Sequence, residues 1–429
     1  MIRLFGAVSG FGCGIRPRLN GWARSKIMIK RIWIVLCGLM LGQRCWKWWQ
    51  VWRFFGKPTP TAQHEPATTL VSLLQPILSG DPHLAICLRA NLNAPSSYKR
   101  EWLWLIDDDD RIAQQLCYGL QAEYAEQTIR IISLPAPAER VNPKTFKLIA
   151  GLQQAQGQII CVLDDDTSLP AYGLEQCLPW LDQAGVGLAF GLPYYRSFDN
   201  TWSSLVALFV NSNSLLTYVP YSQVSEPFTI NGMFYAMRRD VLEQLHGFVG
   251  LEHILADDFA VAQRVQQAGL RLQQTSMRHA IRTTVTNAQR YRSLIQRWFI
   301  FPRESLLRHL NRRERSLLFC LAIVPTLFPL VLAIVSVLRP SQRQRWFAAT
   351  YTLLGLISFI QIDQAYLEQA TPRRYWLFVP FLELLIPVQL IQALLAPQRI
   401  VWRGHVMDVE KGGAFRFVQR RDDGSANGF

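Results

Sequence analysis

Three groups of aspartates are the residues in this sequence whose type and spacing best suit catalysis. Four carboxylates stand in a row at residues 107–110, three at residues 164–166 and two at residues 257–258. The first two groups follow short apolar runs that are typical of strands. Because ligands of open α/β sheets bind outside the carboxyl ends of the strands, both groups are expected where a substrate would bind.

Asp164 and Asp166 are two positions apart, after the apolar run IICVL. Carboxylates at this spacing can converge on one hard cation, Mg²⁺ or Mn²⁺, which keeps several waters and also accepts substrate phosphate oxygens. Such an ion would neutralise the charge that builds on a departing diphosphate. A plain turn after a strand gives the same pattern, so the motif alone leaves both interpretations open.

Asp257 and Asp258 precede apolar residues with helical spacing at 259–265. Helix capping and the helix dipole explain acidic residues at this position without any catalytic role. The functional interpretation is a general base, because an acceptor hydroxyl needs a carboxylate within reach to remove its proton during attack. A metal site and a base together predict a single displacement with no covalent intermediate on the protein.

The row of four aspartates needs cationic or hydrogen-bonding groups among its members, because adjacent carboxylates repel one another. Asp109 and Asp110 suit the base and ribose of a nucleotide, whereas a solvated loop explains Asp107 and Asp108.

Arg297 and Trp298 lie further along, in a stretch whose apolar residues have the helical spacing of a helix at a membrane surface. The Arg297 guanidinium suits a diphosphate, which it can bind through two N–H groups. It suits a lipid headgroup equally well.

The composition indicates a protein that lies partly in lipid. Hydrophobic residues make up 50% of the chain, with 14 Trp and 23 Phe, which is more than one soluble core requires. The net charge of +14 fits an anionic membrane face better than a nucleic-acid groove, although basic residues that merely solubilise the surface explain it too. The eight cysteines are scattered singly and the seven histidines are dispersed, so we expect a reducing compartment and no structural zinc.

The pattern of apolar, polar and charged residues changes along the chain and predicts six segments. Short apolar strands at 68–75, 100–106, 129–134, 158–164 and 186–193 alternate with helical patterns, which is typical of a parallel-sheet α/β domain. The predicted segments are an N-terminal basic segment with a membrane anchor (1–56), a linker (57–67), a catalytic domain (68–288), amphipathic interfacial helices (289–316), transmembrane segments (317–396) and a basic tail (397–429).

Four apolar stretches are candidates for the membrane. The stretch at 32–42 is short for a span, but a Trp-rich segment that suits the membrane interface follows it. It is predicted as a membrane anchor, with an interfacial helix as the alternative. The stretch at 317–338 is long enough to span. The stretches at 346–362 and 375–396 are predicted as spans or as a partly re-entrant pair, since Glu383 in the last is costly inside a bilayer. Basic residues flank these segments on both sides, so the charges give conflicting orientations.

Together these motifs resemble the ceramide glucosyltransferase-like group of family-2-type inverting glycosyltransferases, which includes bacterial hopanoid-associated relatives. The resemblance follows the chain through VSLLQPILSGDPHL (71–84), DDDDR (107–111), VNPKTFKL (141–148), FGLPYY (190–195), INGMFYAMRRDVLEQLHGF (230–248) and LADDFAVA (255–262), with a weaker echo at 400–409.

The resemblance implies an α/β fold of the GT-A type that binds a nucleotide sugar, a UDP-sugar donor, a divalent metal and inversion. It implies that Asp258 is the base, with Asp257 beside it, and that Lys144 contacts the donor diphosphate. Asp109, Asp110 and Asp164 are the other predicted donor-binding residues.

Two positions depart from the family pattern. Leu294 stands where the terminal motif begins with Gln or Arg, although Arg297 and Trp298 remain. Phe190 stands where the ceramide-using members carry His. These departures argue against assuming ceramide as the acceptor.

The sequence thus predicts a glycosyltransferase that moves a hexose or N-acetylhexosamine to a lipid hydroxyl and has no nucleic-acid partner. It is expected to be a multi-pass protein of the cell inner membrane, with its catalytic domain facing the cytoplasm. One alternative is a processive polysaccharide synthase, which needs more spans and an intact terminal motif. Another is a non-catalytic scaffold that binds nucleotide sugar.

Overall fold

The computed structural model describes residues 21–63, 65–402 and 404–419. The chain divides into two units, Met1–Cys45 and Trp46–Phe429. The first twenty residues of the predicted N-terminal segment and the last ten of the predicted tail lie outside the described residues.

Helix α1, Gly21–Phe55, contains the predicted anchor at 32–42. Among the described helices, α1 is not one of the three that are long and apolar enough to cross a membrane. Charged residues such as Lys30 and Arg44 lie on either side of its apolar run and keep the run short. The N-terminal anchor therefore stays a prediction.

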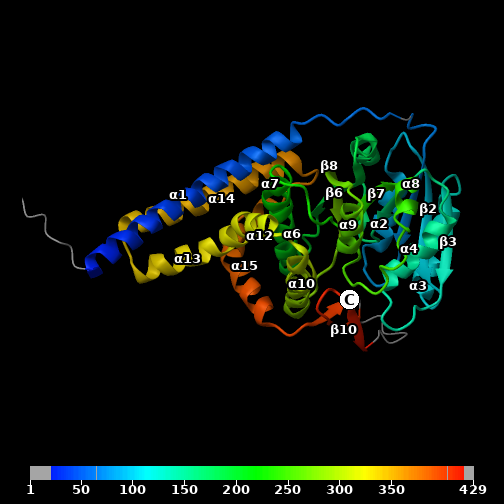
Figure 1. The fold of residues 1–429 in the computed structure, drawn as a ribbon. Coiled ribbons are helices and arrows are strands. Elements are labelled where there is room, and N and C mark those ends of the chain that lie inside the picture. Colours follow the sequence, from blue (N-terminus) through cyan, green and yellow to red (C-terminus); the bar gives the residue numbers. More distant parts are fainter. Residues whose placement is uncertain (1–20, 64, 403, 420–429) are drawn as a thin grey trace, which may run out of the picture. The chain divides into compact units, whose positions relative to one another are not determined.

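An eight-stranded mixed sheet forms the centre of the second unit, in the order β3-β2-β1-β4-β7-β6-β8-β5 (Figure 1). The strands are β1 Leu70–Pro76, β2 Lys99–Asp107, β3 Thr128–Leu134, β4 Ile159–Leu163, β5 Thr167–Ser168, β6 Val186–Tyr195, β7 Phe234–Arg238 and β8 Arg271–Ile281.

The predicted α/β class is confirmed, but the expectation of a parallel sheet is wrong in part. β1 pairs parallel with β2 and β4, whereas β7 runs antiparallel to both β4 and β6. β7 was not among the predicted strands, and the apolar pattern of such a short buried run carries no information about its direction.

Helices cover both faces of the sheet. Leu73 belongs to the hydrophobic cluster that includes α2 and α3, while its neighbour Leu74 belongs to the cluster that includes α4 and α9. This alternation is the expected result of the two-residue period of a strand buried on both faces. The helices of this domain are α2 Leu84–Asn93, α3 Arg111–Glu123, α4 Pro143–Gln154, α5 Gly173–Cys177, α6 Thr201–Asn213, α7 Val219–Ser222, α8 Arg239–Gln244, α9 Asp257–Gln267 and α10 Ala288–Phe301.

Beyond α10 the chain is helical again, as the apolar stretches predict. Three helical segments have the length and composition of membrane spans, Arg312–Leu338, Gln342–Tyr366 and Phe378–Leu395. The helices are α11 Leu307–His309, α12 Arg312–Leu318, α13 Val324–Leu338, α14 Gln342–Tyr366 and α15 Phe378–Leu395, with the short helical turns η3 Pro302–Leu306, η4 Phe319–Ile323 and η5 Arg373–Tyr375 between them.

The predicted basic tail contains a three-stranded antiparallel sheet that the sequence patterns did not reveal. Its strands are β9 Arg399–Trp402, β10 His405–Val409 and β11 Phe415–Gln419. The turn between β10 and β11 has Gly412 and Gly413 at φ 96° and 92°, a conformation that favours glycine. Gly413 O accepts a hydrogen bond of 2.9 Å from Leu255 N, so the tail supports the segment just before Asp257.

Candidate active site

Lys144 joins the second and third aspartate groups. Its Nζ lies 2.7 Å from Asp164 Oδ1 and 3.3 Å from Asp257 Oδ2, and it donates to Gly232 O at 3.0 Å. Burial acts to lower the pKa of Lys144, but the attraction of Asp164 and Asp257 outweighs it and raises the pKa well above the ordinary value. The side chain therefore stays charged, and one ammonium holds together carboxylates that are far apart in the sequence.

The start of α4 positions Lys144. Asn142 caps the helix, because its Oδ1 accepts hydrogen bonds from Lys144 N at 2.9 Å and Thr145 N at 3.4 Å. Asn142 Nδ2 donates in turn to Ile254 O at 3.1 Å and Leu255 O at 3.2 Å. The segment before Asp257 is thus held by α4 on one side and by the tail turn on the other.

Asp258 lies at the start of α9, where Asp258 Oδ1 accepts a hydrogen bond of 2.7 Å from Phe259 N. Burial, followed by the negative charge of Asp257, raises the pKa of Asp258 to about 7, and the nearby Lys144 partly opposes this. A carboxyl group with a pKa near neutral pH is well suited to accept a proton from a hydroxyl.

The three aspartates after β4 have different surroundings. Asp164 faces Lys144, as described above. Asp165 is buried and Asp165 Oδ2 accepts a hydrogen bond of 2.9 Å from Leu78 N, which gives it a structural role. Asp166 Oδ2 accepts a hydrogen bond of 2.9 Å from Thr283 Oγ1 and so ties the turn after β4 to the end of β8.

The first aspartate group divides between buried and exposed members. Asp107 Oδ2 pairs with Lys147 Nζ at 2.9 Å. Asp108 and Asp109 are exposed in the turn after β2. Asp110 caps α3 through Ala113 N at 3.0 Å, and its other oxygen accepts a hydrogen bond of 2.8 Å from Ser79 N after β1. The structure therefore places Asp110 between two loops at the carboxyl edge of the sheet.

Arg297 and Trp298 lie on α10, next to the end of β6. The Trp298 ring packs edge-on against the Tyr195 ring, with 6.1 Å between the ring centroids. It also stacks on the Phe209 ring, with 5.8 Å between the centroids. Burial and then Asp166 raise the pKa of Tyr195, while the positive charge of Arg297 opposes the shift. Both Asp166 and Arg297 are thus near the Tyr195 hydroxyl. Leu294 packs in the same hydrophobic cluster.

The sequence profile of glycosyl transferase family 21 matches residues 32–415, which is most of the chain. The protein belongs to this family. It is a glycosyltransferase, and its α/β domain has the GT-A type fold that the sequence motifs imply.

Two solved structures show more distant likeness to this family 21 chain. The mannosyltransferase PcManGT from Pyrobaculum calidifontis, in complex with GDP-Man and Mn²⁺, has a TM-score of 0.48 and 17% identity over 83% of this chain and 97% of that chain. GalNAc-T7 with UDP, GalNAc and Mn²⁺ has a TM-score of 0.39 and 11% identity over 56% of this chain and 49% of that chain. Both are too distant to assign a substrate.

The oxygen ligands that this family 21 protein offers suit a hard divalent cation. Such a cation takes some of its ligands from the protein and the others from a substrate. Among the residues that the structure describes, no three His, Cys, Asp or Glu side chains converge into a complete metal site. Mg²⁺ typically takes one or two carboxylates and completes its shell with water and substrate phosphates. Asp164 and Asp166, at the end of β4, supply two carboxylates of this kind.

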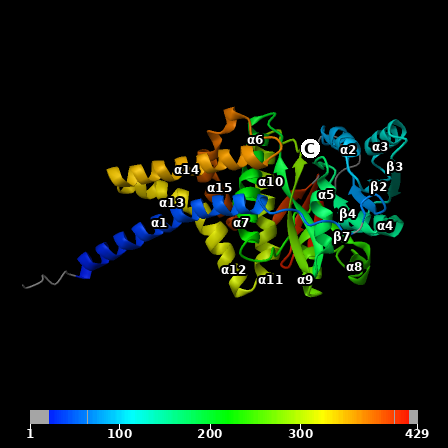
Figure 2. The same cartoon turned by 90° about the horizontal axis from the view of Figure 1, so that it is seen from above.

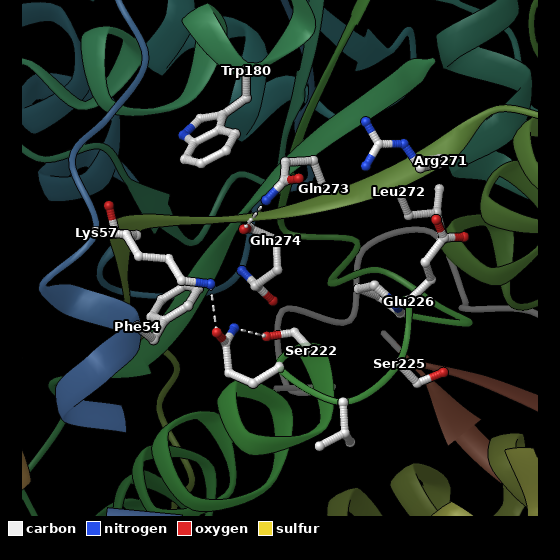
Figure 3. A pocket seen from close by; sticks show the side chains of 14 residues that line it. Phe54, Lys57, Trp180, Ser222, Ser225, Glu226, Arg271, Leu272, Gln273 and Gln274 are labelled. Carbon is white, nitrogen blue, oxygen red and sulfur yellow. Dashed lines mark hydrogen bonds between the residues drawn. The ribbon is translucent and has the colours of Figure 1, made fainter. Parts of the chain in front are cut away.

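A pocket of about 400 Å³ lies elsewhere in the family 21 domain, and Figure 3 shows its lining. It contains none of the predicted site residues. Lys57 Nζ donates to Gln223 Oε1 at 2.6 Å, and Gln223 Nε2 donates to Ser222 Oγ at 3.2 Å, so these lining groups are occupied with one another. The predicted residues Asp164 and Asp257 gather instead around Lys144, outside this pocket.

Sequence reasoning missed three residues that shape the family 21 site. Thr283 binds Asp166, and the charges of Asp166 and Arg297 act in opposite directions on the pKa of Tyr195. Tyr235 of β7 is buried, and burial and then Asp257 raise its pKa well above the ordinary value. The FGLPYY motif signals Tyr195, but no local pattern identifies Thr283 or Tyr235.

Gly232 provides a test of how closely the base is packed. A Cβ at this position would lie 2.9 Å from Asp258 Cβ and 3.1 Å from Asp258 Oδ2. We expect Gly232→Ala to displace the carboxylate and lower kcat by about 10-fold to 100-fold, since small misplacements of a catalytic group have effects of that order. Steady-state kinetics of the purified enzyme measure this.

Gly119→Ala is the matched control, because a Cβ there meets nothing within 4 Å. It lies inside α3, where alanine is favoured over glycine, so full activity is expected. Equal activity of the two variants would contradict a close approach of Gly232 to the base.

Proposed function

We propose that this protein is a membrane-bound inverting glycosyltransferase that moves a hexose or N-acetylhexosamine from a UDP-sugar to a hydroxyl of a lipid acceptor. The observation that carries the proposal is the pair of contacts at Lys144, whose Nζ lies 2.7 Å from Asp164 and 3.3 Å from Asp257. These contacts support the proposal, because one ammonium lies beside both Asp164, the proposed donor-side carboxylate, and Asp257, the neighbour of the proposed base Asp258.

Each side chain has a distinct task in the proposed reaction. Asp258 accepts the proton of the acceptor hydroxyl as its oxygen attacks the sugar carbon, and the half-buried carboxyl with a pKa of about 7 can do so near neutral pH. Attack from the side opposite the departing diphosphate inverts the configuration at that sugar carbon. Asp257 keeps the pKa of Asp258 high. Lys144 keeps the carboxylates of Asp164 and Asp257 in place.

Donor binding is proposed for Asp109, Asp110 and Asp164, with Lys144 and Arg297 as the cations that face phosphate oxygens. Asp164 and Asp166 would hold Mg²⁺ or Mn²⁺, which supplies positive charge to the leaving diphosphate.

The lipid acceptor is supported by the helices that follow the catalytic domain. The three segments with the composition of membrane spans come directly after α10, which carries Arg297 and Trp298. Exposed arginines at the start of α12, including Arg312 and Arg313, suit an anionic lipid face. We propose the cell inner membrane, with the catalytic domain facing the cytoplasm, where nucleotide sugars are available.

The direct test is UDP release by the full chain in proteoliposomes with membrane lipid extract, a panel of UDP-sugars and Mg²⁺ or Mn²⁺. We expect release with one or a few donors, transfer of one sugar to a lipid, and opposite anomeric configurations in donor and product by NMR. A long polymer would indicate the processive synthase instead. Donor binding without any UDP release would indicate the scaffold.

Metal removal gives a second prediction from the same assay. We expect EDTA to reduce turnover by about 100-fold or more, because a bound cation stabilises leaving-group charge by several kcal/mol. Added Mg²⁺ or Mn²⁺ should restore it. Asp166→Asn should raise the metal concentration needed for half-maximal rate, whereas Asp108→Asn, which changes an exposed carboxylate, should not. Full activity in EDTA would rule out metal assistance.

A further inference from the structure

Both ends of α15 are fastened to the catalytic part of the chain. Just before its first turn, Tyr375 Oη donates to Phe198 O at 2.9 Å. At its last turn, Arg303 Nη1 donates to Ala393 O at 2.8 Å and Leu394 O at 3.0 Å. Phe198 precedes α6 and Arg303 follows α10, so α15 begins and ends against the same body.

The middle of α15 packs against that body as well. Val379 and Leu382 share a hydrophobic cluster with Leu205 of α6 and Ile295 of α10. Tyr291 Oη of α10 donates to Gln389 Oε1 at 3.4 Å. The inward face of α15 is therefore covered along its length by α6 and α10.

The two preceding helices are attached differently. The end of α14 is bound to the catalytic domain, because Arg278 Nη1 of β8 donates to Tyr366 O at 2.8 Å and the Tyr366 ring stacks on Phe55 at 4.3 Å. The other end of α14 meets the end of α13, where Leu338 and Trp346 are 73% and 67% exposed. Figures 1 and 2 show α13 and α14 extending away from the sheet, whereas α15 stays beside α6 and α10.

The connection between α14 and α15 is fixed by a buried carboxylate. Asp363, one turn before the end of α14, accepts hydrogen bonds of 2.7 Å from both Thr371 N and Thr371 Oγ1. Trp376 Nε1 donates to Thr371 O at 3.3 Å. The chain thus turns at the base of the α13–α14 hairpin and enters α15 in a defined direction.

The outward face of α15 is apolar. Its exposed large residues recur every three or four positions, as on one side of a helix. They are Leu377, Phe381, Leu384, Val388, Ile391 and Leu395, with exposed fractions from 38% to 83%. A contiguous apolar surface of this size is costly in water and marks a site of contact with lipid or protein.

The charges around this face favour lipid. Arg373 and Arg374 are exposed directly before α15, and Arg308, Arg312 and Arg313 are exposed between α10 and the hairpin. Arginines at the edge of an apolar surface suit anionic headgroups. The two helical segments of the hairpin that precedes α15 also have the length and composition of membrane spans.

We propose that α15 does not cross the membrane and instead lies in the leaflet on the catalytic side, with its outward apolar stripe among the acyl chains. The α13–α14 hairpin is then the crossing element of the C-terminal region. It carries the residues at 339–341 to the far side and returns the chain. This arrangement puts α10, with Arg297 and Trp298, against the leaflet through α15.

Cysteine labelling in sealed vesicles tests the sidedness. The background replaces Cys13 and the exposed Cys45 and Cys320 with serine, and single cysteines are added at the exposed Glu126, Ser341 or Gln398. With a membrane-impermeant maleimide, we expect Gln398→Cys to react from the same side as Glu126→Cys, and Ser341→Cys from the opposite side. Reaction of Gln398→Cys from the side of Ser341→Cys would mean that α15 crosses. Reaction of all three from one side would mean that the hairpin does not cross.

Spin labels on the outward face test the lipid contact independently. Labels at Phe381, Val388 and Leu395 in the full chain, reconstituted in vesicles of neutral and anionic phospholipid, should all be accessible to oxygen and lie at similar shallow depths. A steady increase of depth along the three positions would show a crossing helix. Accessibility to a water-soluble relaxation agent as high as at Glu126 would show that the face does not contact lipid.

Discussion

Replacing Asp258 with asparagine is expected to lower kcat by about 10²-fold to 10⁴-fold, the range that general base catalysis contributes. Asparagine has nearly the same size but cannot accept the proton of the acceptor hydroxyl. The donor should still bind, because Asp164 and Lys144 are unchanged. Kinetics together with titration of UDP-sugar binding measure both effects.

The stability of this variant separates a catalytic role from a structural one. The pKa of Asp258 is raised to about 7 in the folded protein, so above that pH folding requires an ionised carboxylate in a half-buried position. The asparagine variant should therefore be at least as stable as the wild type at pH 8. A lower melting temperature with a proportional loss of donor binding would point to misfolding. Unchanged turnover would exclude Asp258 as the base.

The same pKa predicts the pH dependence of the wild type. The base works only as the carboxylate, so kcat/KM should fall as the pH drops through about 7. A profile that stays flat down to pH 5 would contradict this assignment.

Replacing Lys144 with methionine is the second change with a large expected effect. Asp164 and Asp257 would then lie beside one another without the ammonium that pairs with both. Removing one partner of a buried ion pair typically costs about 3 kcal/mol or more, so the melting temperature in detergent should fall clearly. Lys144 also lowers the pKa of Asp258. Without Lys144, the fall of kcat/KM at low pH, which is the acid limb of the pH profile, should therefore begin at a higher pH.

Lys147→Met is the matched control for this variant. Lys147 lies on the same helix and also pairs with one aspartate, Asp107, at 2.9 Å. Its loss should lower stability but leave the acid limb where it is, because Lys147 is not among the groups that shift Asp258. An equal shift of the pH profile in both variants would show a general effect of unfolding.

Several strands were predictable because local pattern and tertiary environment agree. β1, β2 and β4 are buried on both faces over most of their length, and their sequences are therefore mostly apolar. β8 was missed because it contains the polar residues Gln273, Gln274 and Thr275, whose side chains are satisfied by contacts inside the sheet. The tail sheet was missed because its strands are only four or five residues long and flanked by charge.

The site was predictable in its residue types but not in its connections. Spacing and order identify the aspartate groups, and family resemblance indicates Lys144. That Lys144 pairs with both Asp164 and Asp257 depends on where β4 ends relative to the points at which α4 and α9 begin. Asp165 looks like its neighbours in the sequence, yet it binds Leu78 N, because the turn after β4 gives each of the three aspartates different surroundings.

The hydrogen bond from Leu255 to Gly413 has a consequence for biosynthesis. The segment that carries Asp257 and Asp258 receives this support from a residue that follows all three candidate membrane helices in the chain and is therefore synthesised after them. A nascent chain that has already folded its sheet would still lack the hydrogen bond from Leu255 to Gly413, which supports the segment before Asp257. Turnover would then begin only after the three candidate membrane helices have been synthesised.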